Sequence, residues 1–158
     1  MNTTFENCTL LDTKSWFDKA RPHKTVSNFS AQLGVHFEEV AEMLEALTPQ
    51  NAIANVILAE AEESLKALAT YLKENHGEIL VVPEKANDML DSICDQIVTG
   101  TGVAHTLDYD IVGAMTAVNV SNFSKFDEKG EPIYNEQGKV MKGPNYHKVE
   151  LSPYLPKQ

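Results

Sequence analysis

Helical periodicity constrains the fold of this chain more than any other feature of its sequence. From Ser27 to about Phe126, apolar residues recur at spacings of three and four, which places them along one face of an α-helix. Turn and proline signals divide this stretch into four amphipathic segments, and each must bury its apolar face against another. The pattern predicts an all-α fold, a four-helix bundle with short connections. The predicted helices are about Ser27–Leu47, Ile53–Asn75, Glu84–His105 and Tyr109–Ser124.

Capping and turn residues predict where these helices begin. Ser27 or Asn28 is suited to cap the first helix, and Asp108 or Asp110 to open the fourth, because short polar side chains accept hydrogen bonds from helix N–H groups. Residues 100–102, Gly-Thr-Gly, fall inside the third helix and indicate close helix packing or a bend. The apolar face of that helix predicts four inward-facing side chains, Leu90, Ile93, Cys94 and Ile97.

The segments on either side of the helical core (residues 27–126) have a different character. Residues 1–24 are irregular, apart from a short helix predicted at Thr13–Arg21 that the following proline ends. In the C-terminal segment, residues 127–158, two turns flank Pro132–Tyr134 and Lys139–Met141, so these two stretches are predicted to pair as a small hairpin. The remaining residues predict an extended tail, too short for a second domain. We therefore expect a single domain over the whole chain.

The charge of the chain disfavours one large class of function, the binding of DNA or RNA. The sequence carries 23 acidic and 13 basic side chains, a formal net charge of −10 at pH 7. Proteins that bind polymeric nucleic acid ordinarily present a basic surface, so neither DNA nor RNA is expected as a partner. An acidic protein binds a small phosphate compound when divalent cations lie between its carboxylates and the phosphate. Metal-bridged nucleotide chemistry therefore stays open.

The sequence also predicts a cytoplasmic protein. It has no run of about 18 apolar residues, so no membrane is expected as a partner. The first six residues lack the basic start and apolar core of a secretory signal. Cys8 and Cys94 match no metal-binding or redox spacing, and we expect both to be free thiols in a reducing compartment.

Acidic side chains follow regular spacings on two of the predicted helices. Glu38, Glu42 and Glu45 occur at i, i+4 and i+7, so they share one face of the first helix. Glu39 projects about 100° around the helix from Glu38. On the third helix the acids are four, three and four residues apart and also share a face. These acids are Glu84, Asp88, Asp91 and Asp95.

These two acidic faces have two interpretations. If the helices pack antiparallel through their apolar stripes, the faces converge along one groove, where clustered carboxylates repel one another unless cations neutralise them. Mg²⁺ prefers such oxygen ligands, so the pattern indicates a site for one or two Mg²⁺ ions, with Mn²⁺ as a substitute. The alternative is that both are solvated helix faces, the commoner meaning of a single acidic stripe. Spacing alone does not decide between them.

A string of motifs resembles one known superfamily. Residues 37–43, FEEVAEM, are similar to the EExxE helix of the MazG-like all-α nucleotide pyrophosphohydrolases, which include dimeric dUTPases and phosphoribosyl-ATP pyrophosphohydrolase. Residues 90–97, LDSICDQI, stand where that superfamily has its second motif, ExxD. Residues 119–127, NVSNFSKFD, resemble an NxSK-like signature, and residues 138–146, GKVMKGPNY, resemble the GKxxKGPxY tail of a small branch with bacterial and phage members. The resemblance spans about Phe29 to Leu155.

The resemblance implies a set of metal ligands, with one departure from the family pattern. The glutamate that the family has three residues before Asp95 is Ser92 here, a poor ligand for Mg²⁺. Asp91 lies on nearly the same face as Asp95 and takes its place, whereas pairing Asp88 with Asp91 would keep the spacing of three and shift the register. The implied Mg²⁺ ligands are Glu38, Glu39, Glu42, Asp91 and Asp95, and Glu38 and Glu39 are also the implied catalytic residues.

The resemblance further implies residues that hold the substrate. Lysine is a compact charge suited to phosphate, and asparagine offers both a donor and an acceptor to a sugar or base. Without the resemblance, the lysines of the C-terminal segment read as a solvated hairpin, since lysines are mostly exposed, and Tyr146 as a packing residue. The implied substrate-binding residues are Asn119, Asn122 and Lys125, with Lys139, Lys142 and Tyr146 closing the pocket.

The implied activity is the hydrolysis of a nucleoside triphosphate, with a mild preference for a deoxynucleotide, to a nucleoside monophosphate and pyrophosphate. Water activated by a metal or a glutamate attacks phosphorus, and metal and lysine hold the charge of the leaving pyrophosphate. Family members build their sites between subunits, which implies a homodimer or a dimer of dimers. One alternative is a dedicated phosphoribosyl-ATP or dUTP pyrophosphohydrolase. The other is a non-catalytic helical binding or assembly module with solvated acidic faces.

Overall fold

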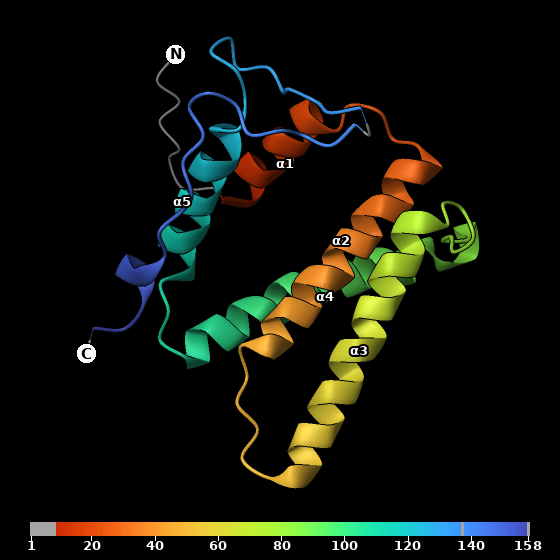
Figure 1. The fold of residues 1–158 in the computed structure, drawn as a ribbon, viewed down its shortest axis with the longest axis vertical. Coiled ribbons are helices and arrows are strands. Elements are labelled where there is room, and N and C mark those ends of the chain that lie inside the picture. The colour runs from red at the N-terminus through yellow and green to blue at the C-terminus, as the bar shows by residue number, and fades with distance from the viewer. Residues whose placement is uncertain (1–8, 137, 158) are drawn as a thin grey trace. The chain divides into compact units, whose positions relative to one another are not determined.

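The protein is all-α, as its periodicity predicts. The computed structural model describes residues 9–136 and 138–157, and these ranges contain five α-helices and two short 3₁₀ turns but no strand (Figure 1). Cys8, predicted to be a free thiol, lies outside the described residues. The helices are α1 (Thr9–Ala20), α2 (Val26–Glu45), α3 (Ala52–Glu74), α4 (Ala86–Thr106) and α5 (Ile111–Phe123), and the 3₁₀ turns are η1 (Pro83–Lys85) and η2 (Ser152–Tyr154).

The chain divides into two compact units. The hairpin unit consists of residues 23–86 and contains α2 and α3. The terminal unit joins the residues up to Pro22 to those from Asn87 onward, so it contains α1, α4, α5 and the C-terminal segment. Each unit has its own helix contacts, α2 with α3 in the first and α1 with α5 in the second.

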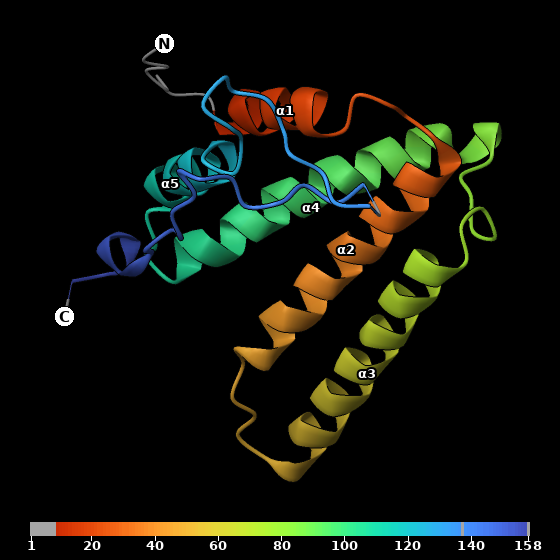
Figure 2. The ribbon, with the colours of Figure 1, turned by 45° about the horizontal axis from the view of Figure 1, so that its top comes forward.

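In the hairpin unit, α2 and α3 pack side by side and antiparallel (Figure 2). Thr25 caps α2, since its hydroxyl oxygen accepts a hydrogen bond of 3.1 Å from the N–H of Asn28. The cap predicted at Ser27 or Asn28 is therefore wrong, because Thr25 is the residue with extended backbone and Val26 already begins the helix. Asn51 caps α3 by accepting a 2.8 Å bond from the N–H of Ala54.

A glycine sets the distance between α2 and α3. Gly34 is buried, and a Cβ added to it would lie 2.8 Å from the carbonyl oxygen of Ala69. Ala41 and Leu72 are also fully enclosed, at 0% and 1% exposure, so the interface is thin and built largely from small side chains. Because backbones approach this closely only where side chains are small, Gly34 is the contact on which the hairpin depends.

In the terminal unit, α1 packs against α5. Asn119 of α5 is 1% exposed and joins the two helices through both ends of its side-chain amide. Its Oδ1 accepts from the hydroxyl of Thr13 at 2.9 Å, and its Nδ2 donates to the carbonyl oxygen of Thr9 at 2.8 Å.

The helix predicted at residues 13–21 begins earlier, at Thr9. Asp110 opens α5 by accepting from the N–H of Gly113 at 2.9 Å, which confirms one of the two predicted caps.

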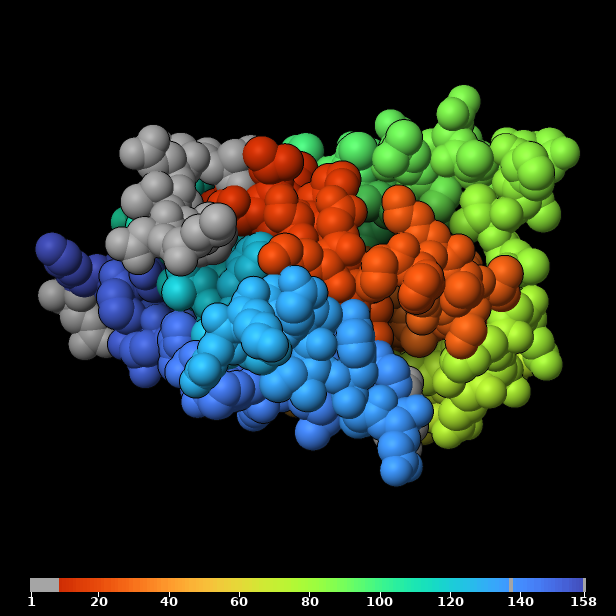
Figure 3. All heavy atoms as spheres, turned by 90° about the horizontal axis from the view of Figure 1, so that it is seen from above, coloured from red at the N-terminus to blue at the C-terminus, as the bar shows by residue number. Residues whose placement is uncertain are grey.

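The C-terminal segment lies over α1 and α5 of the same unit (Figure 3). The predicted hairpin forms as one isolated antiparallel bridge between Tyr134 and Val140. The N–H of Met141 donates to the carbonyl oxygen of Ile133 at 2.7 Å across this bridge. The hydroxyl of Tyr134 donates to the carbonyl oxygen of Ala20 at 3.3 Å, so the bridge is fixed to the end of α1.

α4 is the least covered helix of the terminal unit. Within the described residues it packs against no other helix of that unit, and Ala104 alone of its 21 residues is buried. The prediction that Leu90, Ile93, Cys94 and Ile97 face inward is wrong for the single chain. The three large aliphatic side chains are 43–63% exposed and Cys94 is exposed, because no helix of the unit covers this face.

None of the helices in the described ranges combines the length and apolar character needed to cross a bilayer.

Candidate functional site

The predicted ligands on α2 lie on the surface of the hairpin unit. Glu39 and Glu42 are exposed, whereas Glu38 is half-buried. The Nζ of Lys73, on α3, lies 2.5 Å from Oε2 of Glu38 and forms an ion pair with it. α3 thereby supplies a cation to one of the acids that the family resemblance implies as Mg²⁺ ligands.

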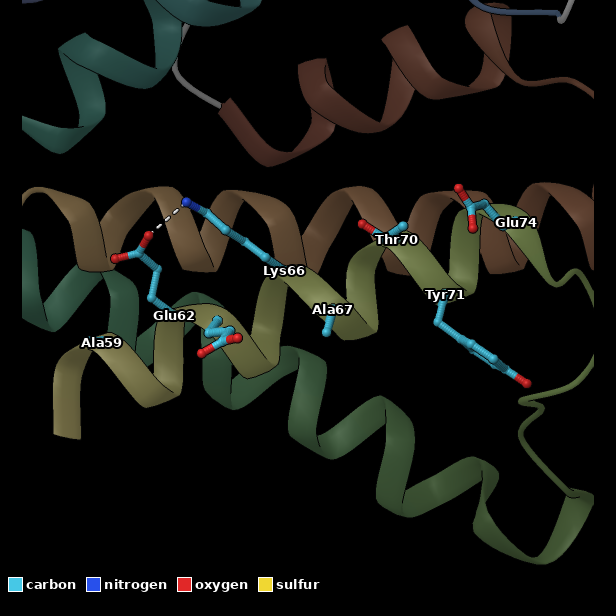
Figure 4. A pocket seen from close by; sticks show the side chains of 8 residues that line it. Ala59, Glu62, Lys66, Ala67, Thr70, Tyr71 and Glu74 are labelled. Carbon is cyan, nitrogen blue, oxygen red and sulfur yellow. Dashed lines mark hydrogen bonds and ion pairs between the residues drawn. The ribbon is translucent and has the colours of Figure 1, made fainter. Parts of the chain in front are cut away.

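A second lysine of α3 neutralises acids outside the predicted ligand set. The Nζ of Lys66 lies 2.5 Å from Oε1 of Glu45 and 2.7 Å from Oε1 of Glu62. These hydrogen bonds, first to Glu45 and then to Glu62, raise the pKa of Lys66 above its ordinary value. Figure 4 shows Lys66 and Glu62 at the edge of an open hollow of about 740 Å³ that is lined by residues of α3 between Ala59 and Glu74. No predicted site residue lines this hollow.

The predicted ligands on α4 are exposed as well. Asp91 and Asp95 are four residues apart, so they lie one turn apart on the same face. Asp91 borders a shallow hollow of about 530 Å³, together with Asp88 and Cys94. Since α2 and α4 belong to different units, the predicted convergence of their acidic faces stays a prediction.

The predicted ligands have the right chemistry for Mg²⁺, but neither unit by itself brings enough of them together to hold the ion. Carboxylate oxygens are the ligands that Mg²⁺ prefers, and Glu39 and Glu42 present theirs to solvent. At Glu38 a metal ion would have to replace the ammonium of Lys73. Within the described residues, no three His, Cys, Asp or Glu side chains gather closely enough to hold a metal ion.

Asn119 has a structural task that the sequence did not reveal. Its amide is enclosed between α1 and α5, and both ends are engaged by Thr13 and Thr9. A substrate contact would require these hydrogen bonds to be exchanged inside a closed interface. The predicted contact between Asn119 and the substrate therefore stays a prediction, and the structure gives this residue a role in joining two helices.

Asn122 and Lys125 lie together at the C-terminal end of α5, beside Trp16 of α1. The Nζ of Lys125 donates to Oδ1 of Asn122 at 2.8 Å and lies 5.7 Å from the centre of the Trp16 ring, a cation–π distance. Trp16 is itself fixed in place: its Nε1 donates to the backbone carbonyl oxygen of Asn122 at 2.9 Å, and its ring stacks on Phe126 with centroids 6.1 Å apart. An indole and an amide oxygen thus hold the lysine ammonium.

A close backbone contact brings the C-terminal segment to the same place. The N–H of Gly143 donates to the carbonyl oxygen of Lys125 at 2.9 Å. A Cβ added to Gly143 would lie 2.6 Å from the carbonyl oxygens of Lys125 and Phe126, so only glycine fits. Lys142, the preceding residue, places its Nζ 4.6 Å from the centre of the Tyr146 ring. The two motifs at residues 119–127 and 138–146 therefore meet at the end of α5.

Four of the six predicted substrate-binding residues lie on the two segments that this backbone contact joins. We call Asn122, Lys125, Lys142 and Tyr146 the lysine cluster. Asn119 lies outside it, between α1 and α5. Lys139 is exposed in the preceding turn, where its N–H donates to Oδ1 of Asn135 at 2.8 Å. Each of the two joined segments thus contributes one lysine, in a chain that is acidic overall.

Sequence reasoning missed three kinds of residue at these sites. Trp16 had no assigned role, and its only signal was that it is the single tryptophan of the chain. Gly143 was part of a motif, but its contact with α5 was not foreseen. The ion pairs of the α3 lysines could have been inferred from spacing. Lys66 and Lys73 are seven residues apart, and so are their partners Glu45 and Glu38. Two antiparallel helices therefore align both ion pairs at once.

Comparison of the chain with protein-family models, with curated proteins and with solved structures finds no match.

Proposed function

We propose that this protein is a Mg²⁺-dependent nucleoside triphosphate pyrophosphohydrolase, which cleaves a ribo- or deoxynucleoside triphosphate between its α and β phosphates. The lysine cluster is the observation that carries the proposal. Residues 122–125 and 142–146, far apart in the chain, are joined by the backbone contact of Gly143 with Lys125, and each segment carries one lysine: Lys125 beside the amide of Asn122, and Lys142 over the ring of Tyr146. In a chain of net charge −10, such a cationic point is suited to a polyphosphate.

The lysine cluster binds the phosphates in this proposal. Lys125 exchanges its contact with Asn122 for a phosphate oxygen, while the Trp16 ring keeps its ammonium in position. Lys142 binds a second phosphate and stabilises the negative charge that develops on the leaving pyrophosphate. Asn122, released from Lys125, offers its amide to the sugar or base, and Lys139 and Tyr146 close the pocket.

The acids supply the metal ligands and the base. Glu38, Glu39 and Glu42 of α2 hold Mg²⁺, or Mn²⁺ in its place, with Asp91 and Asp95 of α4. When bound, the ion neutralises phosphate charge and lowers the pKa of a coordinated water. Glu38 or Glu39 accepts the proton of the attacking water, and the products are a nucleoside monophosphate and pyrophosphate. In this proposal the helices form a four-helix bundle of the MazG-like type, and the enzyme acts in the cytoplasm as a homo-oligomer.

A second candidate is a non-catalytic helical assembly module. The observation in its favour is that Glu38 and Glu45 are ion-paired with Lys73 and Lys66, so the acidic stripe of α2 already contributes to the pairing of α2 with α3. The exposed apolar face of α4 also suits a helical partner. A dedicated phosphoribosyl-ATP or dUTP pyrophosphohydrolase differs from the main proposal in substrate alone.

Pyrophosphate release tests the proposal. The four NTPs, the four dNTPs and phosphoribosyl-ATP are each incubated with the full chain, with and without Mg²⁺. We expect metal-dependent release from at least one of them. The Glu39→Ala/Glu42→Ala variant is expected to lower kcat/KM by more than about 100-fold, because the charge of the transition state is then left without its metal. The best substrate identifies which pyrophosphohydrolase this is.

A matched pair of lysine variants separates the lysine cluster from general charge effects. Lys125→Ala is expected to weaken the binding of inorganic pyrophosphate, followed by Trp16 emission, and to lower activity. Lys129→Ala removes the same charge from an exposed turn of the same segment and is expected to change neither. Equal effects of the two variants would show that the lysine cluster is not the phosphate site. Absence of both Mg²⁺ binding and release would favour the assembly module.

A further inference from the structure

Two serines at the C-terminal end of α5 hold the backbone of the C-terminal segment. Ser121 and Ser124 are three residues apart, so they lie one turn apart on the same face. The hydroxyl of Ser121 donates to the carbonyl oxygen of His147 at 2.8 Å, and the N–H of His147 donates to Oγ of Ser124 at 3.1 Å. Both main-chain polar groups of one residue are thus held by serine hydroxyls. We call this arrangement of Ser121, Ser124 and the His147 backbone the serine clasp.

The hydroxyl hydrogens of both serines are engaged within the protein. Ser124 donates its own to the carbonyl oxygen of Ser121 at 2.7 Å, which leaves its oxygen to accept from His147. A serine in a helix often bonds back to a carbonyl oxygen of its own helix. Ser121 bonds instead to a residue 26 positions away, and it is only 6% exposed, so its hydroxyl depends on this partner. The serine clasp therefore fixes the place of residue 147 on α5.

A second attachment fastens the same stretch four residues earlier. The N–H of Gly143 donates to the carbonyl oxygen of Lys125 at 2.9 Å. The N–H of Tyr146 donates back to the carbonyl oxygen of Gly143 at 3.1 Å, which closes a turn. Pro144 lies inside this turn and restricts its backbone further, because the proline ring fixes φ. Residues 143–147 are therefore a short turn held to α5 at both ends.

The fastened turn carries two residues of the lysine cluster. Tyr146 immediately precedes His147, and Lys142 immediately precedes Gly143. The ammonium of Lys142 lies 4.6 Å from the centre of the Tyr146 ring, so the two side chains also contact each other. Side chains next to a fixed backbone lose less conformational freedom when a ligand binds, and binding is correspondingly tighter.

We propose that Ser121 and Ser124 are positioning residues of the phosphate site. They fasten the turn at residues 143–147 to α5 and thereby hold Lys142 and Tyr146 in place for the phosphates. This purpose rests on the proposed function, whereas the serine clasp itself rests on hydrogen bonds within the terminal unit. Ser124 is the serine of the NxSK-like signature, to which the resemblance gave no role. Its contact with residue 147 joins that signature to the end of the motif at residues 138–146.

Protection from trypsin tests the serine clasp without any substrate. The peptide bond after Lys142 contains the N–H of Gly143, which is bonded to the end of α5, so trypsin cleaves it only when the turn opens. Ser121→Ala/Ser124→Ala removes three hydrogen bonds and is expected to raise the cleavage rate there by at least about 10-fold. Cleavage after Lys129, in an exposed turn, serves as the internal reference and should stay constant. An unchanged rate after Lys142 would overturn the proposal.

Two single variants make this result independent of changes within α5. Gly143→Ala opens the turn from the other side, because the added Cβ would lie 2.6 Å from the carbonyl oxygens of Lys125 and Phe126. We expect the same rise in cleavage, with the helices intact by circular dichroism. Ser15→Ala is the matched control in the same unit, since its hydroxyl bonds to the carbonyl oxygen of Leu11 in its own helix. It should leave the cleavage rates unchanged.

The affinity for inorganic pyrophosphate separates positioning from simple attachment of the segment. Followed by Trp16 emission in the presence of Mg²⁺, the affinity of Ser121→Ala/Ser124→Ala is expected to fall by at least about 10-fold. Ser124→Thr keeps a hydroxyl at this place and should bind as the wild type does. Faster cleavage with unchanged affinity would mean that the serines only attach the segment, which contradicts the positioning role. A wild-type chain that binds no pyrophosphate would contradict the proposed function and this role with it, whereas trypsin protection still decides whether the serine clasp forms.

Discussion

α2 and α4 are helices of almost equal length with the same kind of sequence, but their surroundings are opposite. They have 20 and 21 residues, each with an apolar stripe and an acidic face, and α2 contains one internal glycine whereas α4 contains two. α2 packs its glycine against α3 and has two of its acids paired with lysines. α4 leaves its apolar stripe exposed and has open space around Gly100. An amphipathic pattern thus identifies the face that requires burial, but not the molecule that buries it.

The two glycines give the sharpest test of this difference, and the largest effect is expected at Gly34. In Gly34→Ala the new methyl group meets the carbonyl oxygen of Ala69 and the side chain of Lys73, both at 2.8 Å. We expect the helices to be forced apart and the free energy of unfolding to fall by about 1–3 kcal/mol. Urea denaturation followed by circular dichroism measures the change. An unaltered midpoint would mean that α2 and α3 are not in close contact.

Gly100→Ala is expected to act in the opposite direction. The added methyl group meets nothing in its own chain, and alanine is the better helix former, so unfolding should cost up to about 1 kcal/mol more. Urea denaturation followed by circular dichroism measures the change. A loss of stability comparable to that of Gly34→Ala would show that Gly100 is packed within the single chain.

The ion pair between α2 and α3 contributes less. Lys73→Met keeps the aliphatic part of the side chain and removes the charge next to Glu38. Since the pair is partly exposed, we expect a loss of about 0.2–1 kcal/mol, which should shrink as salt is added. The same variant frees Glu38 and should strengthen Mg²⁺ binding if this residue is a ligand. A salt-independent loss would instead assign the effect to packing.

The smallest effect on the metal-free protein is expected on α4. Asp91→Asn removes one charge from an exposed acidic face, so the stability should change by no more than about 0.5 kcal/mol. Thermal unfolding in excess Mg²⁺ sharpens the comparison, because a bound ion stabilises only the chain that holds it. The wild-type midpoint should rise with Mg²⁺ and that of Asp91→Asn should rise less. Equal responses would remove Asp91 from the ligand set.

The helices themselves could be predicted from local sequence, because periodicity and capping are local properties. The range predicted for α3 is close to the observed one, since Asn51 precedes a regular apolar pattern. Asp110, one of the two residues predicted to open the fourth helix, caps α5. The start of α1 was missed because Thr9 depends on a contact with Asn119, more than 100 residues away. The coverage of Leu90 and Ile97 was misjudged because periodicity identifies an apolar face and does not say which element covers it.

The candidate site was predictable in part. Lys125 and Lys142 were assigned from motifs, and Gly143 brings their segments together. The enclosure of Asn119 was not foreseen, because an asparagine at a helix interface and one in a binding site look alike in a sequence. The partner of Glu38 required the register of α2 against α3, which depends on the close approach at Gly34 and not on the acidic pattern itself.

The position of Trp16 gives one unit of the protein a natural optical label. It lies in the interface between α1 and α5, while residues 23–86 contain a tyrosine but no tryptophan. Indole emission therefore reports on the terminal unit, whereas far-ultraviolet circular dichroism sums the helices of both units. Coincident denaturation curves would describe one cooperative body, and separated curves two bodies that melt independently. Trp16 emission and circular dichroism together therefore measure the cooperativity between the terminal unit and the hairpin unit without an added dye.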